Sequence, residues 1–253
     1  MWKADGMLLP LRLAAGAAVA VLSVAGLTAC SDDDGGGVTS NTSADTDDDG
    51  DISAEEVLAL ARTTFDDTSG VSLSLTTSDL PDGVDGLVSA TGVATHAPAF
   101  EGVATVSLSG SPFNVDPLVA VDGKVYASIP GVPITQEIDP EESGAPDPAR
   151  LMDPEEGFSS ILTETDDLEQ GETVRGGADN KEVLTEYTGT VDGSVVENII
   201  PSAEGDFDVT YTIAENGELR EAQLTGVFYP DADEMTYTVG IDDYGTEKDI
   251  SKP

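Results

Sequence analysis

The chain has 253 residues, of which 50 are Asp or Glu and only 10 are Lys or Arg, so its formal net charge is -40. Such a surface repels the phosphates of nucleic acids and the anionic headgroups of membranes, which excludes binding to either by charge. We interpret the acidity as a means of staying soluble outside the cell, rather than as a surface for one dedicated partner.

Residues 1–29 have the layout of a secretory signal peptide. Two basic residues flank the start of an apolar run over residues 13–27, which is too short and too early for a membrane span of the mature protein. The run leads into Leu27-Thr28-Ala29-Cys30, which fits the cleavage site of a lipoprotein signal peptidase. Cys30 is the only cysteine, so it has no disulfide partner, and lipidation accounts for it. We therefore expect a protein anchored through lipidated Cys30 on the extracytoplasmic face of the cell membrane; the alternative is an uncleaved anchor helix with an incidental cysteine.

Residues 30–52 are rich in Asp, Gly, Ser and Thr, a composition that cannot bury enough apolar surface to fold. We expect this segment to be an acidic, flexible tether between the lipid anchor and a domain over residues 53–253. About 200 residues are enough for one domain with a sizeable core, but marginal for two.

A calcium-loop pattern overlaps the end of the tether. Oxygen-bearing side chains fall at the ligating positions of such loops, and Gly50 occupies the sixth position. The missing incoming helix argues against the pattern, as does the ease with which an Asp-rich stretch produces it. We keep calcium as a candidate cofactor and expect no other; its candidate ligands are Asp45, Asp47, Asp49, Asp51, Ser53 and Glu56.

The first predicted element of the domain is an amphipathic helix. Ser53 and Glu56 have the spacing of a capping box, in which each side chain satisfies a free backbone amide of the first turn. Apolar residues then recur at helical spacing up to Phe65, and the helix is expected to end near Asp67, before Gly70 restarts the chain.

Alternation of apolar with polar residues predicts strands around residues 71–75 and 103–108. Pro117 interrupts the next apolar stretch, residues 115–121. Beyond it, Asp122-Gly123 is a tight-turn signal that leads into Val125, Tyr126 and Ile129, and predicts a hairpin.

A second helix is predicted to open at Asp153-Pro154, with proline at its first position and an apolar face of Phe158, Ile161, Leu162 and Leu168. A third, short helix is predicted over residues 195–200, ended by Pro201. Three alternating runs follow, residues 207–214, 219–229 and 235–241, and Asn216-Gly217 joins the first two as a hairpin.

These elements predict an α+β domain in which a few short helices cover the apolar face of a broad antiparallel sheet. The helices are few and short for such a sheet. Either the sheet curls tightly or some of its apolar surface lines a cavity, and the pattern leaves both open.

Four segments, in this order and spacing, resemble the actinobacterial LppX/LprG (LppX_LprAFG) family of lipoproteins. They are the helix over residues 54–65 leading into residues 69–75, residues 152–158, residues 187–191 followed by a short helix and a proline, and residues 207–213 running through the Asn216-Gly217 turn into residues 219–224. The resemblance implies a curved antiparallel sheet, or half-barrel, wrapped around helices and enclosing a large hydrophobic cavity. It also implies a carrier of acylated lipid or glycolipid, because members of the family carry such lipids toward the cell envelope. The very acidic surface and the Asp-rich tether depart from the family.

The resemblance supplies no catalytic motif, and we predict that the protein is not an enzyme. We expect a monomer, with an envelope transporter as a candidate further partner. Apolar helix faces inside the sheet supply the candidate cavity residues, although an ordinary close-packed core is the alternative for each. They are Val57, Leu58, Phe65, Phe158, Ile161 and Leu162.

Two other functions remain open. One is a non-enzymatic envelope interaction protein with a filled core that uses its acidic face or the calcium loop. The other is a surface hydrolase that uses carboxylates. Against the hydrolase, His96 is the only histidine, no Gly-x-Ser-x-Gly motif occurs, and the mature chain has no tryptophan to stack a sugar.

Overall fold

The computed structural model describes residues 52–253, apart from 129–130, 132–133, 140–145 and 178–179. The predicted signal peptide and tether, Cys30, and four candidate calcium ligands (Asp45, Asp47, Asp49 and Asp51) lie outside the described residues. The stretch from Asp48 to Pro253 forms one compact unit. No helix within the described residues is long and apolar enough to span a bilayer.

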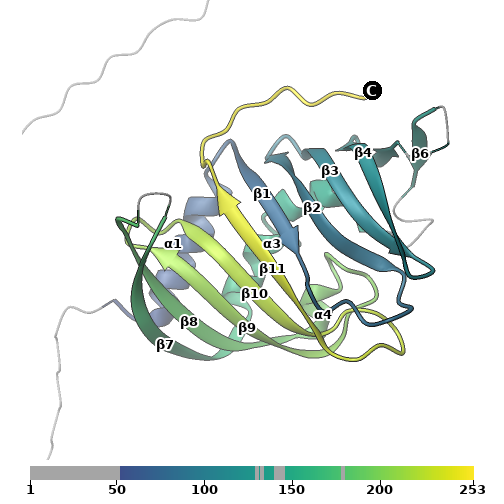
Figure 1. Ribbon diagram of the computed structural model, residues 1–253. Coiled ribbons are helices and arrows are strands. Elements are labelled where there is room, and N and C mark those ends of the chain that lie inside the picture. The colour runs from purple at the N-terminus through teal and green to yellow at the C-terminus, as the bar shows by residue number, and fades with distance from the viewer. Residues whose placement is uncertain (1–51, 129–130, 132–133, 140–145, 178–179) are drawn as a thin grey trace, which may run out of the picture. The chain divides into compact units, whose positions relative to one another are not determined.

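One antiparallel sheet of eleven strands dominates the described domain (Figure 1), in the order β6-β5-β4-β3-β2-β1-β11-β10-β9-β8-β7. The first and last strands, β1 (Gly70–Thr76) and β11 (Met235–Asp242), pair in the middle of the sheet. The earlier half of the domain therefore builds one wing, β1 to β6, and the later half builds the other, β7 to β11.

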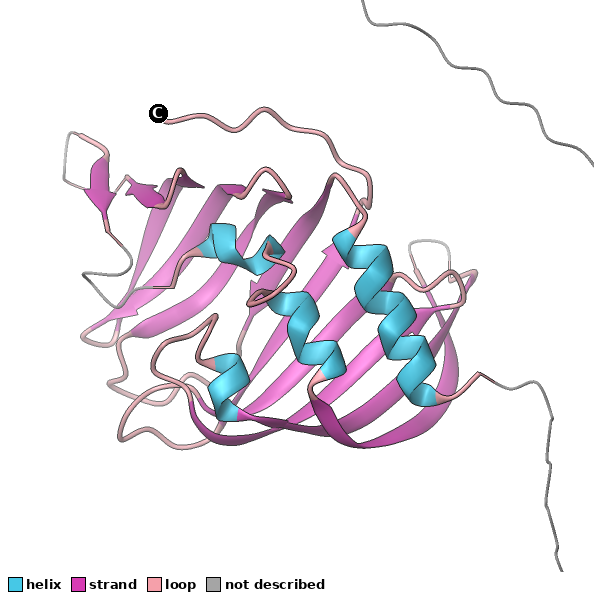
Figure 2. Cartoon of the chain, turned by 180° about the vertical axis from the view of Figure 1, so that it is seen from behind, coloured by secondary structure: helices cyan, strands magenta, loops and turns pink. Residues whose placement is uncertain are grey.

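The first wing continues with β2 (Gly86–Thr95), β3 (Ala99–Leu108), β4 (Ser111–Val121), β5 (Lys124–Ala127) and β6 (Gln136–Ile138). The second wing contains β7 (Thr165–Gly176), β8 (Glu182–Asp192), β9 (Glu204–Ala214) and β10 (Leu219–Val227). The described helices are α1 (Ala54–Asp66), the 3₁₀ helix η1 (Pro148–Met152), α3 (Phe158–Thr163) and α4 (Gly193–Val196). They lie on one face of the curved sheet, which we call the inner face (Figure 2).

Helix α1 begins and ends as predicted. The Ser53 hydroxyl accepts a hydrogen bond from the Glu56 amide at 3.2 Å, and the Glu56 carboxylate accepts one from the Ser53 amide at 3.0 Å. This capping box satisfies two amides that the first turn would otherwise leave free. Asp67 caps the other end, and the helix buries the side chains of Leu58, Ala61 and Phe65.

The core lies between these helices and the inner face of the sheet, and several aromatic rings pack in it where it meets the second wing. The ring centroids of Phe207 and Phe228 are 4.8 Å apart, as are those of Phe228 and Tyr237. The Phe207 ring lies against Gly226, where a Cβ would meet ring carbon Cδ1 at 2.4 Å. Because the glycine leaves that space empty, a large ring packs flat on the sheet.

After β11 the chain crosses to the first wing and runs along its upper edge (Figure 1). Lys248 pairs with Glu101 and Lys252 pairs with Glu137, each at 3.2 Å. The Lys252 ammonium also lies 4.8 Å from the centre of the Tyr126 ring. This crossing ties the last residues of the chain to β3, β5 and β6.

The predicted second helix starts at the wrong residue. Asp153 accepts hydrogen bonds from the amides of Glu155 and Glu156 and closes a turn, and α3 begins only at Phe158. Leu168, placed on this helix by its spacing, lies in β7. The third predicted helix is also shorter, since α4 ends at Val196 and the chain turns before Pro201.

Two strand predictions also need correction. Strand β4 runs through Pro117, because its pairing with β3 shifts register between Gly102 and Ala104 and accommodates the proline there. Strand β10 ends at Val227, so Tyr229 lies beyond it.

The predicted turns are confirmed. Asp122 and Gly123 both have positive φ and join β4 to β5, while Gly217, at φ 82°, follows Asn216 between β9 and β10. Of the predicted hairpin residues, Ile129 lies outside the described residues. The predicted fold class, a curved antiparallel sheet around a few short helices, is confirmed.

Candidate functional site

Five of the six predicted cavity residues come together under α1 and α3. Leu58, Phe65, Phe158, Ile161 and Leu162 are at most 4% exposed and belong to one hydrophobic core, with the rings of Phe65 and Phe158 6.3 Å apart. The sixth, Val57, is partly buried against the same core. These side chains contribute to one packed cluster; that they line a cavity stays a prediction.

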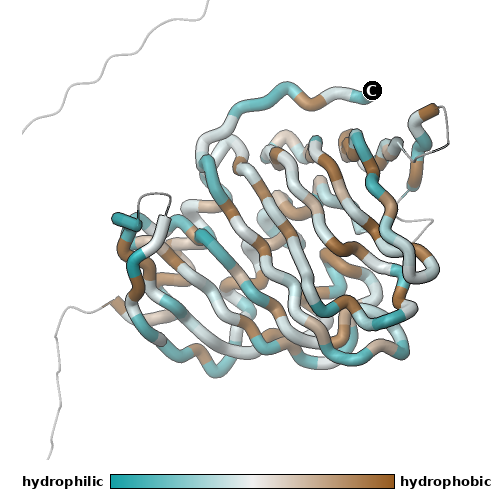
Figure 3. The backbone as a smooth tube through the Cα atoms, viewed as in Figure 1, coloured by the Kyte–Doolittle hydropathy of each residue, from teal (hydrophilic) through white to brown (hydrophobic). Residues whose placement is uncertain are grey.

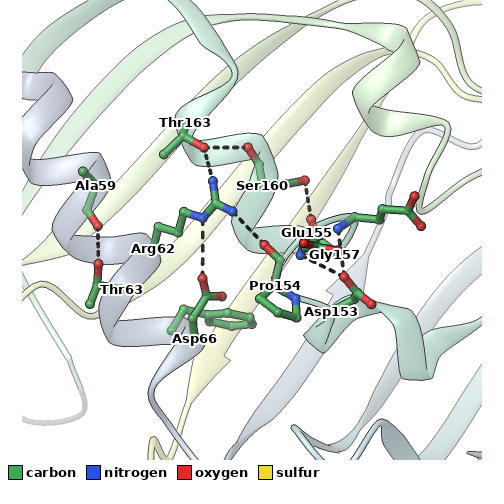
Figure 4. Close-up of polar contacts among 12 residues, drawn as sticks. Ala59, Arg62, Thr63, Asp66, Asp153, Pro154, Glu155, Gly157, Ser160 and Thr163 are labelled. Carbon is green, nitrogen blue, oxygen red and sulfur yellow. Dashed lines mark hydrogen bonds and ion pairs between the residues drawn. The ribbon is translucent and has the colours of Figure 1, made fainter.

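Arg62 fixes α1 to the segment that contains α3 (Figure 4). Its Nη1 donates to the Thr163 hydroxyl at 2.6 Å, and its Nη2 donates to the Pro154 carbonyl at 2.7 Å. Its Nε lies 3.5 Å from the Asp66 carboxylate, one turn along α1. The guanidinium therefore holds two helices at a set distance over the second wing.

Gly157 makes the sharp approach to α3 possible (Figure 4). A Cβ at this position would lie 2.3 Å from the Asp153 carbonyl oxygen and 2.6 Å from that of Arg150. The Ser160 hydroxyl donates to the Gly157 carbonyl at 2.7 Å. The chain can therefore turn from η1 directly into a buried helix.

The inner face of the first wing is apolar, as the strand register shows. Ala90 of β2 pairs with Leu75 of β1 on one side and with Ala104 of β3 on the other. Directly opposite residues share a face of the sheet, so this row continues the apolar side of β1. We call the resulting surface the inner patch: Leu87, Ala90, Ala104, Val106, Val115, Leu118, Ala127 and Ile138.

The described helices cover the two wings unequally. Helix α4 packs on β8 and β9, and α1 packs on α3 and β7, whereas the first wing has η1 against β2, β3 and β4 (Figure 2). Five members of the inner patch therefore remain only partly buried: Leu87, Ala90, Val106, Leu118 and Ile138. Figure 3 shows hydrophobic segments alternating with polar ones along these strands, consistent with one apolar and one polar face.

Phe100 belongs to the packed core and lies beside the inner patch. Its ring lies over two glycines of neighbouring strands, with Cζ 2.5 Å from where a Cβ of Gly92 would stand and 2.8 Å from that of Gly102. Two residue pairs further along these strands, on the same face, Ala90 and Ala104 begin the patch.

The inner patch continues to the tip of the β3–β4 hairpin. Phe113 pairs with Val106 and so shares its face, and Leu108 is two residues beyond Val106. Leu108 is 46% exposed and Phe113 36% exposed. Ser109 and Gly110, both with positive φ, form the tight turn between them.

Two tyrosines hold the end of β2 beside the patch. The pairing of β2 with β3 shifts register between Leu87 and Ser89. The Leu87 amide donates to the Tyr229 hydroxyl at 2.9 Å, and the Tyr237 hydroxyl donates to the Leu87 carbonyl. Burial raises the pKa of Tyr237 well above its ordinary value, and the neighbouring Tyr229 raises it further. Tyr237 is therefore neutral at physiological pH, and the two hydroxyls supply hydrogen bonds where the ladder is irregular.

Two pockets among the described residues are polar, in contrast to the inner patch. One, of about 550 Å³, lies on the outer face, where Arg220 donates two hydrogen bonds to Glu182 and pairs with Glu218 at 2.7 Å. The other, of about 260 Å³, adjoins α4 and includes Asp192 and Glu197. Their charged linings suit neither an acyl chain nor another apolar ligand.

The residues proposed for other chemistry have structural contacts. His96 lies with Nε2 3.0 Å from the Phe65 carbonyl and its ring edge-on to the Phe65 ring. Ser53 and Glu56, the two candidate calcium ligands within the described residues, form the capping box. No cluster of His, Cys, Asp and Glu within the described part of the chain is arranged to hold a metal ion. Calcium binding by the segment before α1 stays a prediction.

Sequence reasoning missed the inner patch. Its central residues are Ala90 and Ala104, which carry little hydrophobic signal, and the flanking Gly92 and Gly102 carry none. Only the register reveals that they share a face with Val106 and Leu118.

The fold and the patch define a class of protein: an α+β half-barrel whose partly open inner face is apolar. Residues 53–251 match the sequence model of the LppX_LprAFG lipoprotein family, and the chain belongs to this family. It is 28% identical over 161 residues to a lipoarabinomannan carrier protein, LprG of Mycolicibacterium hassiacum. That alignment spans 63% of this chain and 66% of the relative, slightly less than two thirds of its length.

Two solved structures share the fold at 16% sequence identity. The crystal structure of LprF from Mycobacterium bovis superposes with a TM-score of 0.62, covering 79% of this chain and 96% of LprF. That of the lipoprotein LppX from Mycobacterium tuberculosis gives a TM-score of 0.57, covering 78% of this chain and 98% of LppX.

Proposed function

We propose that this lipoprotein carries an acylated lipid or glycolipid, with the acyl chains held against the inner patch. The observation that carries the proposal is the partly open apolar face of the first wing in a chain of net charge -40. An acyl chain gains about 0.8 kcal/mol for each methylene that it buries, so long chains suit a surface of this kind. The headgroup would remain in water.

The name of the LprG relative, a lipoarabinomannan carrier, supports a glycolipid as the cargo. Lipidation of Cys30 would anchor the carrier on the extracytoplasmic face of the membrane, because two or more acyl chains bind a bilayer stably where one binds weakly. The cargo would then be taken up and released at the same surface. We propose that the carrier works as a monomer and without catalysis.

The test compares two valine substitutions on the same strand. Val106 belongs to the inner patch, whereas Val103 is on the outer face of β3 and 41% exposed. The unit from Asp48 onward, purified from a lipid-rich host, is extracted with organic solvent and its lipids are quantified by mass spectrometry. We expect Val106→Asp to lose the lipid, because a charge would be buried against the acyl chains, and Val103→Asp to retain it.

Thermal unfolding of both variants checks that each is folded. Equal lipid content in the two folded variants would contradict the inner patch as the binding surface. A complete lack of lipid, in the unsubstituted protein too, would favour an envelope interaction protein with a filled core.

A further inference from the structure

The distal part of the β3–β4 hairpin is unusual because it contains no charged residue. About a quarter of all residues in the chain are charged (24%), yet residues 102–115, which span the distal part of this hairpin, contain no Asp, Glu, Lys or Arg. Its two large apolar side chains near the tip, Leu108 and Phe113, are exposed. Exposed apolar side chains in an uncharged segment are suited to contact with an apolar phase.

These side chains are continuous with the inner patch. Phe113 pairs with Val106 of the patch, and Leu108 follows Val106 on the same face of β3. A lipid could therefore move along one uncharged surface from the hairpin tip to Ala104 and Val115 without crossing a charged side chain of β3 or β4.

The chain's own length keeps the hairpin near a bilayer. Twenty-three peptide units join Cys30 to Ser53, a distance of at most about 80 Å when fully extended. If Cys30 carries the lipid anchor, the domain cannot leave the membrane surface by more than this distance.

We propose that the β3–β4 hairpin tip inserts Leu108 and Phe113 into the surface of a lipid bilayer, where the inner patch takes up and releases its lipid. This inference rests on the proposed carrier function and names the surface through which it operates.

Carboxylates at the same end of the sheet determine whether a neutral or an anionic bilayer is bound more strongly. Asp85 accepts a hydrogen bond from the Ser109 amide at the turn, and Asp79 and Asp82 lie in the segment before β2. Anionic headgroups would be repelled by these three, so a neutral bilayer is bound more strongly.

Tryptophan fluorescence can test this contact, because the unit from Asp48 onward contains no tryptophan. Phe113→Trp places one at the hairpin tip. Val174→Trp is the matched control, since Val174 is 38% exposed on the edge strand β7 of the other wing. With phosphatidylcholine vesicles, we expect the emission of Phe113→Trp to shift to shorter wavelength and to be quenched by brominated acyl chains, and that of Val174→Trp to stay unchanged. Adding phosphatidylglycerol should reduce the emission shift and the quenching of Phe113→Trp. Raising the salt concentration should restore both, because salt screens the repulsion between the anionic headgroups and the carboxylates.

A second variant tests the same surface without a probe. The double substitution Leu108→Ser with Phe113→Ser should lower vesicle affinity by on the order of tenfold, because the two apolar side chains that would be buried in the bilayer are lost. Its unfolding temperature should change little, because both side chains are exposed.

The outcomes separate this inference from the carrier function. An unshifted Phe113→Trp spectrum, or an equal shift in both tryptophan variants, overturns the hairpin contact whether or not the protein holds extractable lipid. A shift in Phe113→Trp alone supports the contact, even if no lipid is found and the carrier function fails. Self-association through the hairpin without vesicle binding, seen by sedimentation, would assign the surface to a second copy and also overturn the inference.

Discussion

Two glycines and one phenylalanine show how single residues shape the inner face. The Phe100 ring needs the space over Gly92 and Gly102, and a Cβ at Gly102 would also stand 2.1 Å from the Thr91 carbonyl oxygen. A backbone atom cannot move aside as a flexible side chain can. The position of Phe100 beside the inner patch therefore depends on residues with no side chain.

Gly102→Ala should destabilise the fold by roughly 1–3 kcal/mol, the usual cost of overpacking a well-filled site. Urea unfolding of the unit from Asp48 onward measures this. Gly171→Ala is the control in strand β7, because its Cβ would meet nothing closer than 3.3 Å. Equal midpoints for the two variants would show that the sheet adjusts and that Phe100 does not need the glycine.

Tyr237 makes stability depend on pH in the alkaline range. Burial holds its pKa above the ordinary tyrosine value of about 10, so only the unfolded chain ionises near that pH. Its contribution to stability is therefore complete below about pH 10 and is lost as pH rises from the unfolded toward the folded pKa.

Tyr237→Phe removes both this ionisation and the hydrogen bonds with Tyr229 and Leu87. At pH 7.5 we expect a loss of about 1 kcal/mol in the free energy of unfolding. Near pH 10.5 the difference in the free energy of unfolding between Tyr237→Phe and the unsubstituted protein should narrow. At that pH Tyr237 can ionise in the unfolded chain but not in the folded one, which lowers the stability of the unsubstituted protein alone. Tyr211 and Tyr244, whose pKa values burial also raises, are present in both proteins and cancel. A difference that is constant with pH would contradict this reading.

At the scale of elements, the hydrogen bonds of Arg62 fix the packing of α1 against α3. Arg62→Met keeps the apolar stem but loses the hydrogen bonds to Thr163 and Pro154. We expect a loss of about 1–2 kcal/mol and faster hydrogen exchange in α3. Arg175→Met is the control, because Arg175, near the end of β7, donates to the carbonyl of Lys181 at 3.3 Å and lies on another element than α1 and α3. Similar exchange in α3 for both variants would assign the packing of the helices to apolar contacts alone.

Elements with strong local signals were predictable from the sequence. The capping box at Ser53 and the turns at Asp122-Gly123 and Asn216-Gly217 are short-range features, and the structure has them where expected. Strand β7 was missed because it is an edge strand whose side chains are mostly polar and exposed, so Leu168 alone was read as helical.

The candidate site was predictable only in part, for a physical reason. Residues on α1 and α3, such as Leu58 and Ile161, are large and periodic, and the structure buries them together. The inner patch instead depends on pairing between strands, which places Ala90 beside Ala104. Pairing is a long-range property that no local pattern encodes.

At the scale of the whole molecule, unequal covering of the two wings is the main feature. The second wing packs on α1 and α4 and on a core with several aromatic rings, and the first wing keeps a partly open apolar face beside η1 (Figure 2). A protein of net charge -40 that leaves such a face uncovered loses stability unless something apolar occupies it. The carrier function assigns that place to a lipid.

Native mass spectrometry of the unit from Asp48 to Pro253, purified from a lipid-rich host, tests this most directly. We expect an added mass that is present under native conditions, disappears on denaturation, and matches a lipid with long acyl chains. The mass of the bare polypeptide alone, from several hosts that differ in lipid content, would contradict it.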